Sequence, residues 1–110
     1  MYKIAFFVPP EDAERVKAAM FSAGAGRIGS YDHCCWQVSG CGQFRPLAGS
    51  RPAKGELNRL EVLEELRVEM VCEEACLAAV LQALLRAHPY ETPAYEYWAI
   101  NPPLPSPALP

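Results

Sequence analysis

Three stretches of the chain have the residue pattern of a β-strand. From Tyr2 to Val8 both sets of alternate positions are largely apolar, which predicts a strand with both faces at least partly covered. From Leu60 to Cys72 apolar residues alternate with glutamates and an arginine. These residue types also favour helices, but the period of two predicts one long strand. The segment from Tyr95 to Ile100 predicts the last strand.

Two further stretches place apolar residues at steps of three and four, which is the period of an amphipathic helix. The first begins at Pro10, a residue that suits the first helical turn, and we expect Gly24 to end it as a left-handed cap. The second opens at Glu73 and Glu74, carries a stripe of leucine and valine, and stops before Pro89. Each helix therefore has one apolar face to bury.

All seven glycines of the chain lie between residues 24 and 55. Within this stretch, residues 34–42 predict a strand weakened by glycine, and Phe44 resumes the pattern beyond Gly40 and Gly42. A β-bulge is expected at this glycine kink. Residues 45–58 contain turn formers and charges without any period, so they predict an exposed loop.

The elements follow the order β-α-β-β-α-β. This order predicts an α+β fold of the ferredoxin-like kind, in which a four-stranded antiparallel sheet carries two helices on one face. We expect residues 1–101 to form this single domain. Five prolines after residue 101 predict an extended tail over residues 102–110.

Composition and charge narrow the classes of protein that the chain can belong to. The chain has 110 residues, of which 51% are hydrophobic and 21% charged, and a net charge of −3. An acidic balance argues against a nucleic-acid partner. No apolar run is long enough to span a membrane, and the first residues do not resemble a signal peptide. Together with an odd number of cysteines, five, this predicts a cytoplasmic protein with reduced thiols.

Four runs of the sequence resemble the inserted domain of the YqfO-type members of the Nif-three-like family: GAGRIGSYDHCCW, GCGQFRPLAGSRPAKGE, LEVLEELRVE and AHPYETPAYEY. The fold of that domain is similar to the fold of the PII and CutA proteins. The resemblance covers residues 2–100 and implies a small domain that associates with itself, as a homotrimer in the manner of CutA and PII. It implies no reaction. The flanking halves that carry the family's paired-metal ligands are not in the sequence, so we expect a free-standing version of the insert.

The glycine-rich stretch is also basic, although the chain as a whole is acidic. Residues 27–59 hold five basic and two acidic residues. Backbone N–H groups in glycine turns and basic side chains can together bind phosphate or carboxylate groups. The expected binding residues for a small anionic ligand are Gly24, Gly26, Gly29, Tyr31, Arg45, Arg51, Lys54, His88 and Glu91. The alternative is a loop shaped for contact between subunits.

The run HPYETPAY, residues 88–95, allows two interpretations. His88 and Glu91 could act as acid and base, because histidine titrates near neutral pH and a nearby carboxylate tunes it. Alternatively Pro89 and Pro93 define a turn between the helix and the strand, with the ring of Tyr90 buried as its anchor. The second interpretation is structural and requires no chemistry.

Histidines, cysteines and one glutamate also offer ligands for zinc or copper. The candidates are His33, Cys34, His88 and Glu91, with Cys35 and Cys41 as further thiols. Their spacing matches no C-x-x-C or H-x-x-x-H pattern, so a structural use of these residues is the competing interpretation. We expect no cofactor, with zinc or copper as the alternative.

These patterns predict a non-enzymatic oligomeric module that senses a small ligand or contacts a protein. A divalent metal-binding protein of CutA character is the alternative. An enzyme ranks third, because no nucleophile, base and orienting group stand together at a recognisable spacing. The long strand from Leu60 to Cys72 supports self-association, because an unpaired edge of that length would be prone to aggregate.

Overall fold

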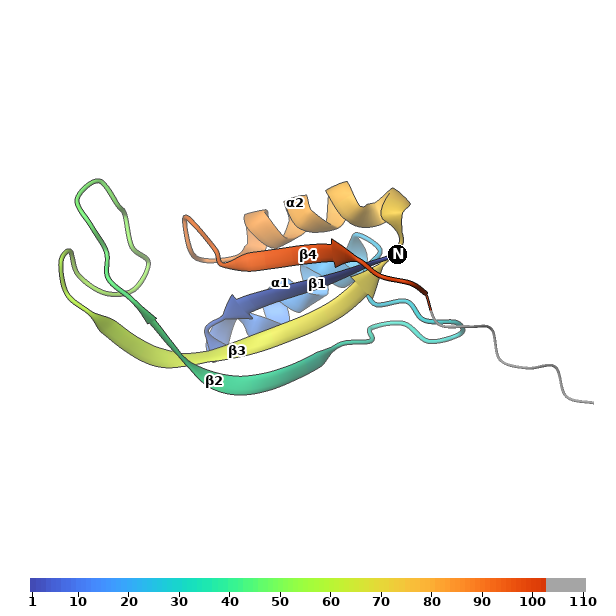
Figure 1. Ribbon diagram of the computed structural model, residues 1–110, viewed down its shortest axis with the longest axis horizontal. Coiled ribbons are helices and arrows are strands. Elements are labelled where there is room, and N and C mark those ends of the chain that lie inside the picture. The colour runs from blue at the N-terminus through green and yellow to red at the C-terminus, as the bar shows by residue number, and fades with distance from the viewer. Residues whose placement is uncertain (103–110) are drawn as a thin grey trace, which may run out of the picture.

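The computed structural model describes residues 1–102, which form four strands and two helices (Figure 1). The elements are β1 (Tyr2–Val8), α1 (Pro10–Ser22), β2 (Trp36–Phe44), β3 (Glu61–Cys72), α2 (Leu77–Ala87) and β4 (Tyr95–Ala99), and a 3-10 turn (Glu74–Cys76) precedes α2. Their order is the predicted one, and their bounds agree with the predicted bounds to within a few residues. The predicted tail lies outside the described residues apart from Pro102.

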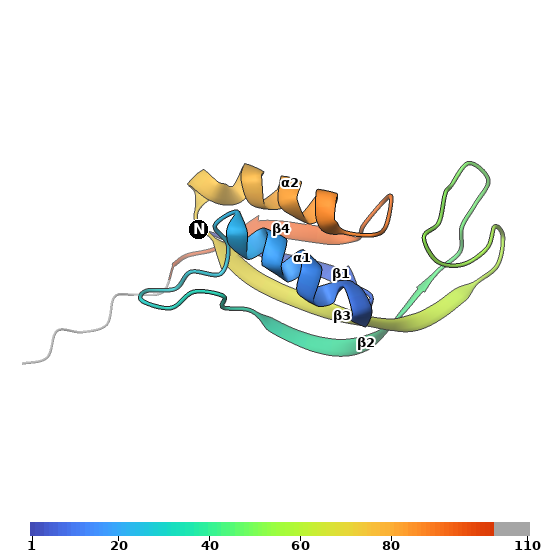
Figure 2. The same cartoon turned by 180° about the vertical axis from the view of Figure 1, so that it is seen from behind.

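The four strands form one antiparallel sheet in the order β2-β3-β1-β4. Figures 1 and 2 show both helices on the same face of this sheet, with α1 and α2 side by side. The ferredoxin-like α+β fold predicted from the pattern is therefore confirmed.

The hydrophobic core lies between the central strand β1 and the two helices. Alternate residues of β1 point toward the helices, and Phe6 is fully buried at the middle of this row. Val16 of α1 and Leu84 of α2 are equally buried and belong to the same cluster. Burying a large apolar side chain stabilises the fold by about 1.5–3 kcal/mol, so this layer is what attaches the helices to the sheet.

The hairpin of β2 and β3 extends beyond the rest of the sheet. β1 pairs with β3 only as far as Leu66, whereas β2 pairs with β3 down to Glu61. Residues 61–65 are therefore paired on one edge only. Figure 1 shows this end of the hairpin curving toward the segment between α2 and β4. The connection between the two strands, residues 45–60, is called the hairpin loop below.

The bulge predicted at Gly40 and Gly42 is wrong. The pairing of β2 with β3 runs in constant register from Trp36 opposite Glu69 to Phe44 opposite Glu61. Gly42 leaves room for a side chain of β3 and makes no kink. A Cβ atom at this position would lie 1.8 Å from the Oε1 atom of Glu65, so the carboxylate of Glu65 would have to move.

Two local predictions concern the segment after α1. Gly24 directly follows Ala23, the C-cap residue of α1, and has a φ of +115°. The predicted ending of the helix at a glycine with positive φ is therefore confirmed. The strand predicted over residues 34–42 begins later than expected, because β2 starts at Trp36 and Cys34 and Cys35 precede it. Within residues 1–102, no helix combines the length and the apolar character that crossing a membrane requires.

Candidate functional site

A cavity of about 570 Å³ lies between the hairpin loop and the segment that joins α2 to β4. Its lining comes from the end of β2 with the hairpin loop, from Glu65 on β3, and from residues 90–94. Arg45, Lys54 and Glu91 all line it, so three of the predicted ligand-binding residues meet here. The volume falls in the range of about 300–1,000 Å³ that is usual for small-molecule sites.

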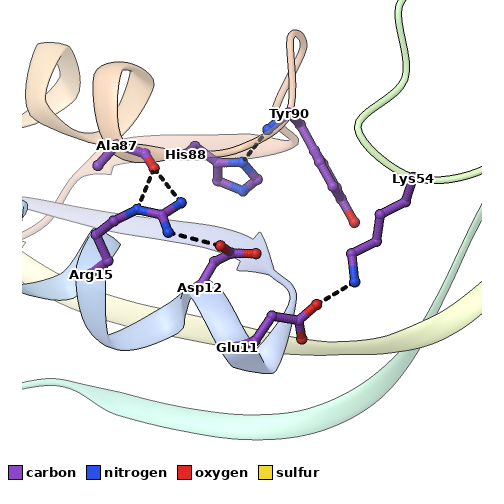
Figure 3. A network of polar contacts seen from close by, with 7 residues as sticks. All are labelled: Glu11, Asp12, Arg15, Lys54, Ala87, His88 and Tyr90. Carbon is purple, nitrogen blue, oxygen red and sulfur yellow. Dashed lines mark hydrogen bonds and ion pairs between the residues drawn. The ribbon is translucent and has the colours of Figure 1, made fainter.

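Two polar contacts hold the hairpin loop over the body of the domain. The backbone N–H of Arg51 donates to Oε1 of Glu91 at 2.8 Å. The ammonium group of Lys54 forms an ion pair and hydrogen bond with Glu11 at the start of α1 (Figure 3). This bond lowers the pKa of Glu11 and raises the pKa of Lys54. The side chains of Lys54 and Glu11 both reach solvent, where an ion pair contributes little to stability. The loop is therefore held weakly.

His88 is buried, with 6% of its surface exposed, and both ring nitrogens are bonded to backbone groups. The N–H of Tyr90 donates to Nδ1 at 3.1 Å, so Nδ1 is the acceptor and the neutral ring carries its proton on Nε2. Nε2 lies 2.7 Å from the carbonyl oxygen of Phe7 and donates to it. Burial is the main cause that lowers the pKa of His88. This geometry supports the structural interpretation of His88, because both ring nitrogens are used in hydrogen bonds to the backbone and neither is available to a ligand.

A second polar cluster joins the two helices (Figure 3). The guanidinium group of Arg15 donates to the carbonyl oxygen of Ala87 through Nε at 3.3 Å and Nη2 at 3.0 Å. The same group pairs with Asp12 at 2.9 Å. A cation at the C-terminal end of α2 interacts favourably with the helix dipole. Arg15 thus supports the turn that carries His88 and Tyr90.

Tyr90 and Glu65 form the inner wall of the cavity. The hydroxyl of Tyr90 donates to Oε2 of Glu65 at 3.3 Å, and its ring lies 6.0 Å from the ring of Phe44 between centroids. Burial, together with the charge of Glu65, raises the pKa of Tyr90 to about 12. The hydroxyl therefore stays protonated and donates at neutral pH.

Sequence reasoning missed Glu65 and Glu11 as parts of this site. Glu65 is one of several glutamates along β3, and nothing in its local pattern separates it from the others. Glu11 matched the ordinary preference for acidic residues in the first turn of a helix. The one available signal was Gly42, since a glycine inside a strand often marks a close approach.

Arg51 and His88 lie at the cavity end, whereas Gly24, Gly26, Gly29 and Tyr31 lie at the opposite end of the sheet. The N–H of Gly26 donates to Val71 near the end of β3 at 2.8 Å, whereas the cavity lies beyond the other end of β1. A Cβ at Gly26 would lie 2.6 Å from the ring of Phe21, and its φ is +80°, so glycine is required for packing there. Gly24 and Gly29 belong to the same turn, with Tyr31 exposed on it. The structure thus divides the predicted binding set in two.

The predicted metal ligands are divided in the same way. His33 pairs with Asp32 at 3.1 Å and lies 4.9 Å from the ring of Phe21, near Cys34 and far along the sheet from His88 and Glu91. Across residues 1–102, no group of three or more His, Cys, Asp or Glu residues is placed to hold a metal ion. A zinc or copper site stays a prediction, which elemental analysis of the purified protein would test.

Similarity to known proteins extends over nearly the whole domain. No family model matches the chain. It is 48% identical over 101 residues to a Mycobacterium leprae protein and 43% identical over 99 residues to a Bacillus subtilis protein, both named GTP cyclohydrolase 1 type 2 homolog. These matches cover 92% and 90% of the chain but only 26% of each relative. The chain therefore spans about a quarter of the length of the curated relatives it matches.

Solved structures place the same domain within a wider fold. A Bacillus cereus protein related to NIF3 matches with 37% identity and a TM-score of 0.77, over 91% of the chain and 25% of that protein. The periplasmic divalent cation tolerance protein CutA of Archaeoglobus fulgidus has 18% identity and a TM-score of 0.64, with coverage of 94% and 88%. GlnK of B. subtilis has 20% identity and a TM-score of 0.52, and the match covers 90% of this chain and 83% of GlnK. The chain is thus a homologue of one domain of the Nif-three-like proteins, the inserted domain with the PII- and CutA-like fold.

Proposed function

We propose that this domain is a non-enzymatic, self-associating module that binds a small ligand with an anionic group in the cavity under the hairpin loop. One observation carries the proposal. The cavity gathers Arg45 and Lys54 from the loop with Glu91 from the distant α2–β4 segment, in a volume suited to a metabolite. The proposal contains binding and no reaction.

The charges around the loop support an anionic ligand. The stretch of residues 27–59 is basic within a chain of net charge −3, so an anion is attracted here and repelled elsewhere. Lys54 already pairs with the carboxylate of Glu11. A ligand carboxylate or phosphate would replace Glu11 as the partner of Lys54, which would release the loop from α1. Occupancy of the cavity is thereby linked to the attachment of the hairpin loop, and this is the proposed sensing step.

Self-association is proposed through the face of the sheet that the helices leave open. Trp36, Val38 and Trp98 are 59%, 43% and 39% exposed. The register places Trp36 and Val38 opposite Glu69 and Arg67 on β3, and this row faces away from the core. Exposed apolar side chains gathered on one face indicate an interaction surface. A homotrimer in the manner of CutA and PII is the proposed assembly.

The names of the curated relatives point to GTP, but the chain spans only about a quarter of those proteins. Any reaction of the whole relatives therefore belongs to a separate proposal. GTP and other phosphate compounds nevertheless belong in the first panel of test ligands, together with carboxylates.

A thermal-shift screen of that panel tests the proposal. At 100 times its dissociation constant a ligand stabilises the protein by about 2.7 kcal/mol, which such a screen detects. The triple variant Arg45→Ala, Arg51→Ala, Lys54→Ala is expected to lose the response while keeping its assembly and melting temperature. Arg27→Ala is the matched control, because it removes a basic residue at the other end of the sheet. A flat screen on the wild type, with a triple variant that fails to assemble, would instead assign the loop to subunit or protein contact.

A further inference from the structure

Glu65 is a carboxylate in the wall of a cavity in which Lys54 and Glu91 already have partners. Glu11 is paired with Lys54, and Glu91 accepts from the backbone of Arg51. Within residues 1–102, by contrast, no basic side chain pairs with Glu65, whose carboxylate accepts only from the neutral hydroxyl of Tyr90. An ionised carboxylate that is partly buried gains most from a cationic partner. That partner is missing from the described part of the chain.

Gly42 and Tyr90 are the two neighbours that define where this carboxylate lies. Oε1 of Glu65 occupies the space that a side chain at residue 42 would fill, because a Cβ there would lie 1.8 Å away. Oε2 is bonded to the hydroxyl of Tyr90, whose ring also contacts Phe44. A carboxylate that fits over a glycine and accepts a hydrogen bond from a phenol in a cavity wall is suited to recognition of a ligand group.

The balance of charges then restricts the class of ligand. Arg45 and Lys54 line the cavity together with Glu65 and Glu91, so its charged lining is formally neutral. A polyanion would meet two carboxylates, and like charges at close range are repelled. A ligand that carries one charge of each sign would meet a complementary group for both.

We propose, on the basis of the function proposed above, that the ligand is a small zwitterion of the amino-acid type. Its ammonium group is received by Glu65, and its carboxylate lies toward Arg45 and Lys54. The apolar body of the ligand packs on Phe44 and Tyr90, and two prolines of the hairpin loop lie in the same wall. Glu65 is then the residue that determines specificity.

Calorimetric titration with matched probes tests this class. The first probe is leucine or phenylalanine, the second is isocaproate or phenylpropionate, which lack the ammonium group, and the third is isoamylamine or phenylethylamine, which lack the carboxylate. The zwitterion is expected to bind the wild type at least about tenfold more tightly than either partial probe, as charge-assisted hydrogen bonds are strong. Glu65→Gln should remove that advantage and leave the binding of the carboxylate probes unchanged.

A glycine pair supplies a test that retains the charge of Glu65. Gly42→Ala displaces the carboxylate, whereas Gly40→Ala on the same strand meets only a backbone oxygen of Glu65 at 3.9 Å, which is an ordinary contact. Binding of the zwitterion should fall about tenfold or more in Gly42→Ala and stay at the wild-type level in Gly40→Ala. Equal binding by these two variants would contradict the proposal.

The outcomes separate this inference from the function on which it rests. If carboxylate or phosphate probes bind as tightly as the zwitterions and Glu65→Gln binds all of them like the wild type, the anion-binding function stands and the zwitterion assignment is overturned. If no probe binds, GTP and inorganic phosphate included, both are overturned.

Discussion

At the scale of single residues, the cavity wall depends on a buried neutral histidine. His88 joins the carbonyl of Phe7 on β1 to the N–H of Tyr90 in the following turn. Protonation would put a hydrogen on Nδ1, which could then no longer accept from Tyr90. Tyr90 in turn positions Glu65. A change of charge on one ring is thus transmitted to the group that we assign to ligand recognition.

The lowered pKa of His88 predicts a loss of stability in acid. Because the folded state binds the proton less readily than the unfolded chain, the free energy of unfolding is full above the ordinary histidine pKa of 6.5 and declines as the pH falls below it. Urea unfolding of the wild type between about pH 8 and pH 5 should show this slope. In His88→Gln the part of this slope that comes from His88 should be absent, whatever the stability of the variant at pH 8.

His33→Gln is the control for that measurement. The side chain of His33 is 68% exposed and pairs only with the neighbouring Asp32. Its removal leaves the buried ring of His88 and both of its backbone contacts in place, so the acid slope assigned to His88 should persist. An identical slope in wild type and His88→Gln would show that burial of His88 does not govern the acid response.

At the scale of elements, the hairpin loop is attached to the domain at few points. β2 and β3 are firmly paired up to Phe44 and Glu61, and beyond them the loop contacts the body through Lys54 and the backbone of Arg51. Segments with few buried contacts open locally at a small cost in free energy. The loop is therefore the element whose position a ligand can change most easily.

Release of the Lys54 contact should loosen the loop without unfolding the domain. Lys54→Met and Glu11→Gln are each expected to accelerate amide hydrogen exchange over residues 45–60 by several-fold, and the double variant should add little, because both substitutions remove one ion pair. The melting temperature should change little, since an exposed pair contributes little to stability.

Glu56→Gln serves as the control for loop release. Glu56 pairs with Arg59 inside the same loop, and within residues 1–102 no hydrogen bond or ion pair joins its side chain to α1. Exchange over the loop should stay at the wild-type rate in this variant. Acceleration as large as in Glu11→Gln would mean that any loss of charge loosens the loop, and that the contact with α1 has no special role.

At the scale of the whole molecule, the helices cover one face of the sheet and leave the other face with exposed tryptophans. Residues 61–65 of β3 add a segment that extends past β1. Both features are unfavourable in an isolated chain, because apolar surface and unpaired strand edges promote association. Self-association would cover them in a defined way.

Light scattering should therefore find a species about three times the 12.1 kDa of the chain at micromolar concentration. Trp36→Glu adds a charge on the open face beside Glu69 and should shift the protein toward the monomer. Tyr31→Glu, at an exposed position outside the sheet, should not. A wild type found only at the mass of one chain would contradict self-association.

The fold could be predicted from the chain alone, because its determinants are local. The period of two along Leu60 to Cys72, the helical stripes and the Pro10 and Gly24 boundaries each depend on neighbouring residues. The order of elements then left one simple arrangement. The bulge at Gly42 was predicted wrongly because its true cause, the side chain of Glu65, lies on another strand.

The site depended on contacts that only the tertiary structure creates. The basic loop was recognisable because its charges are clustered in the sequence, but its partner Glu11 lies 43 residues away along the chain. Tyr90 and Glu65 are 25 residues apart. Division of the predicted binding set between two ends of the sheet also followed from strand pairing, which no local pattern encodes. Periodic burial is a property of neighbours in sequence, whereas complementary charges and the room for a side chain are properties of neighbours in space.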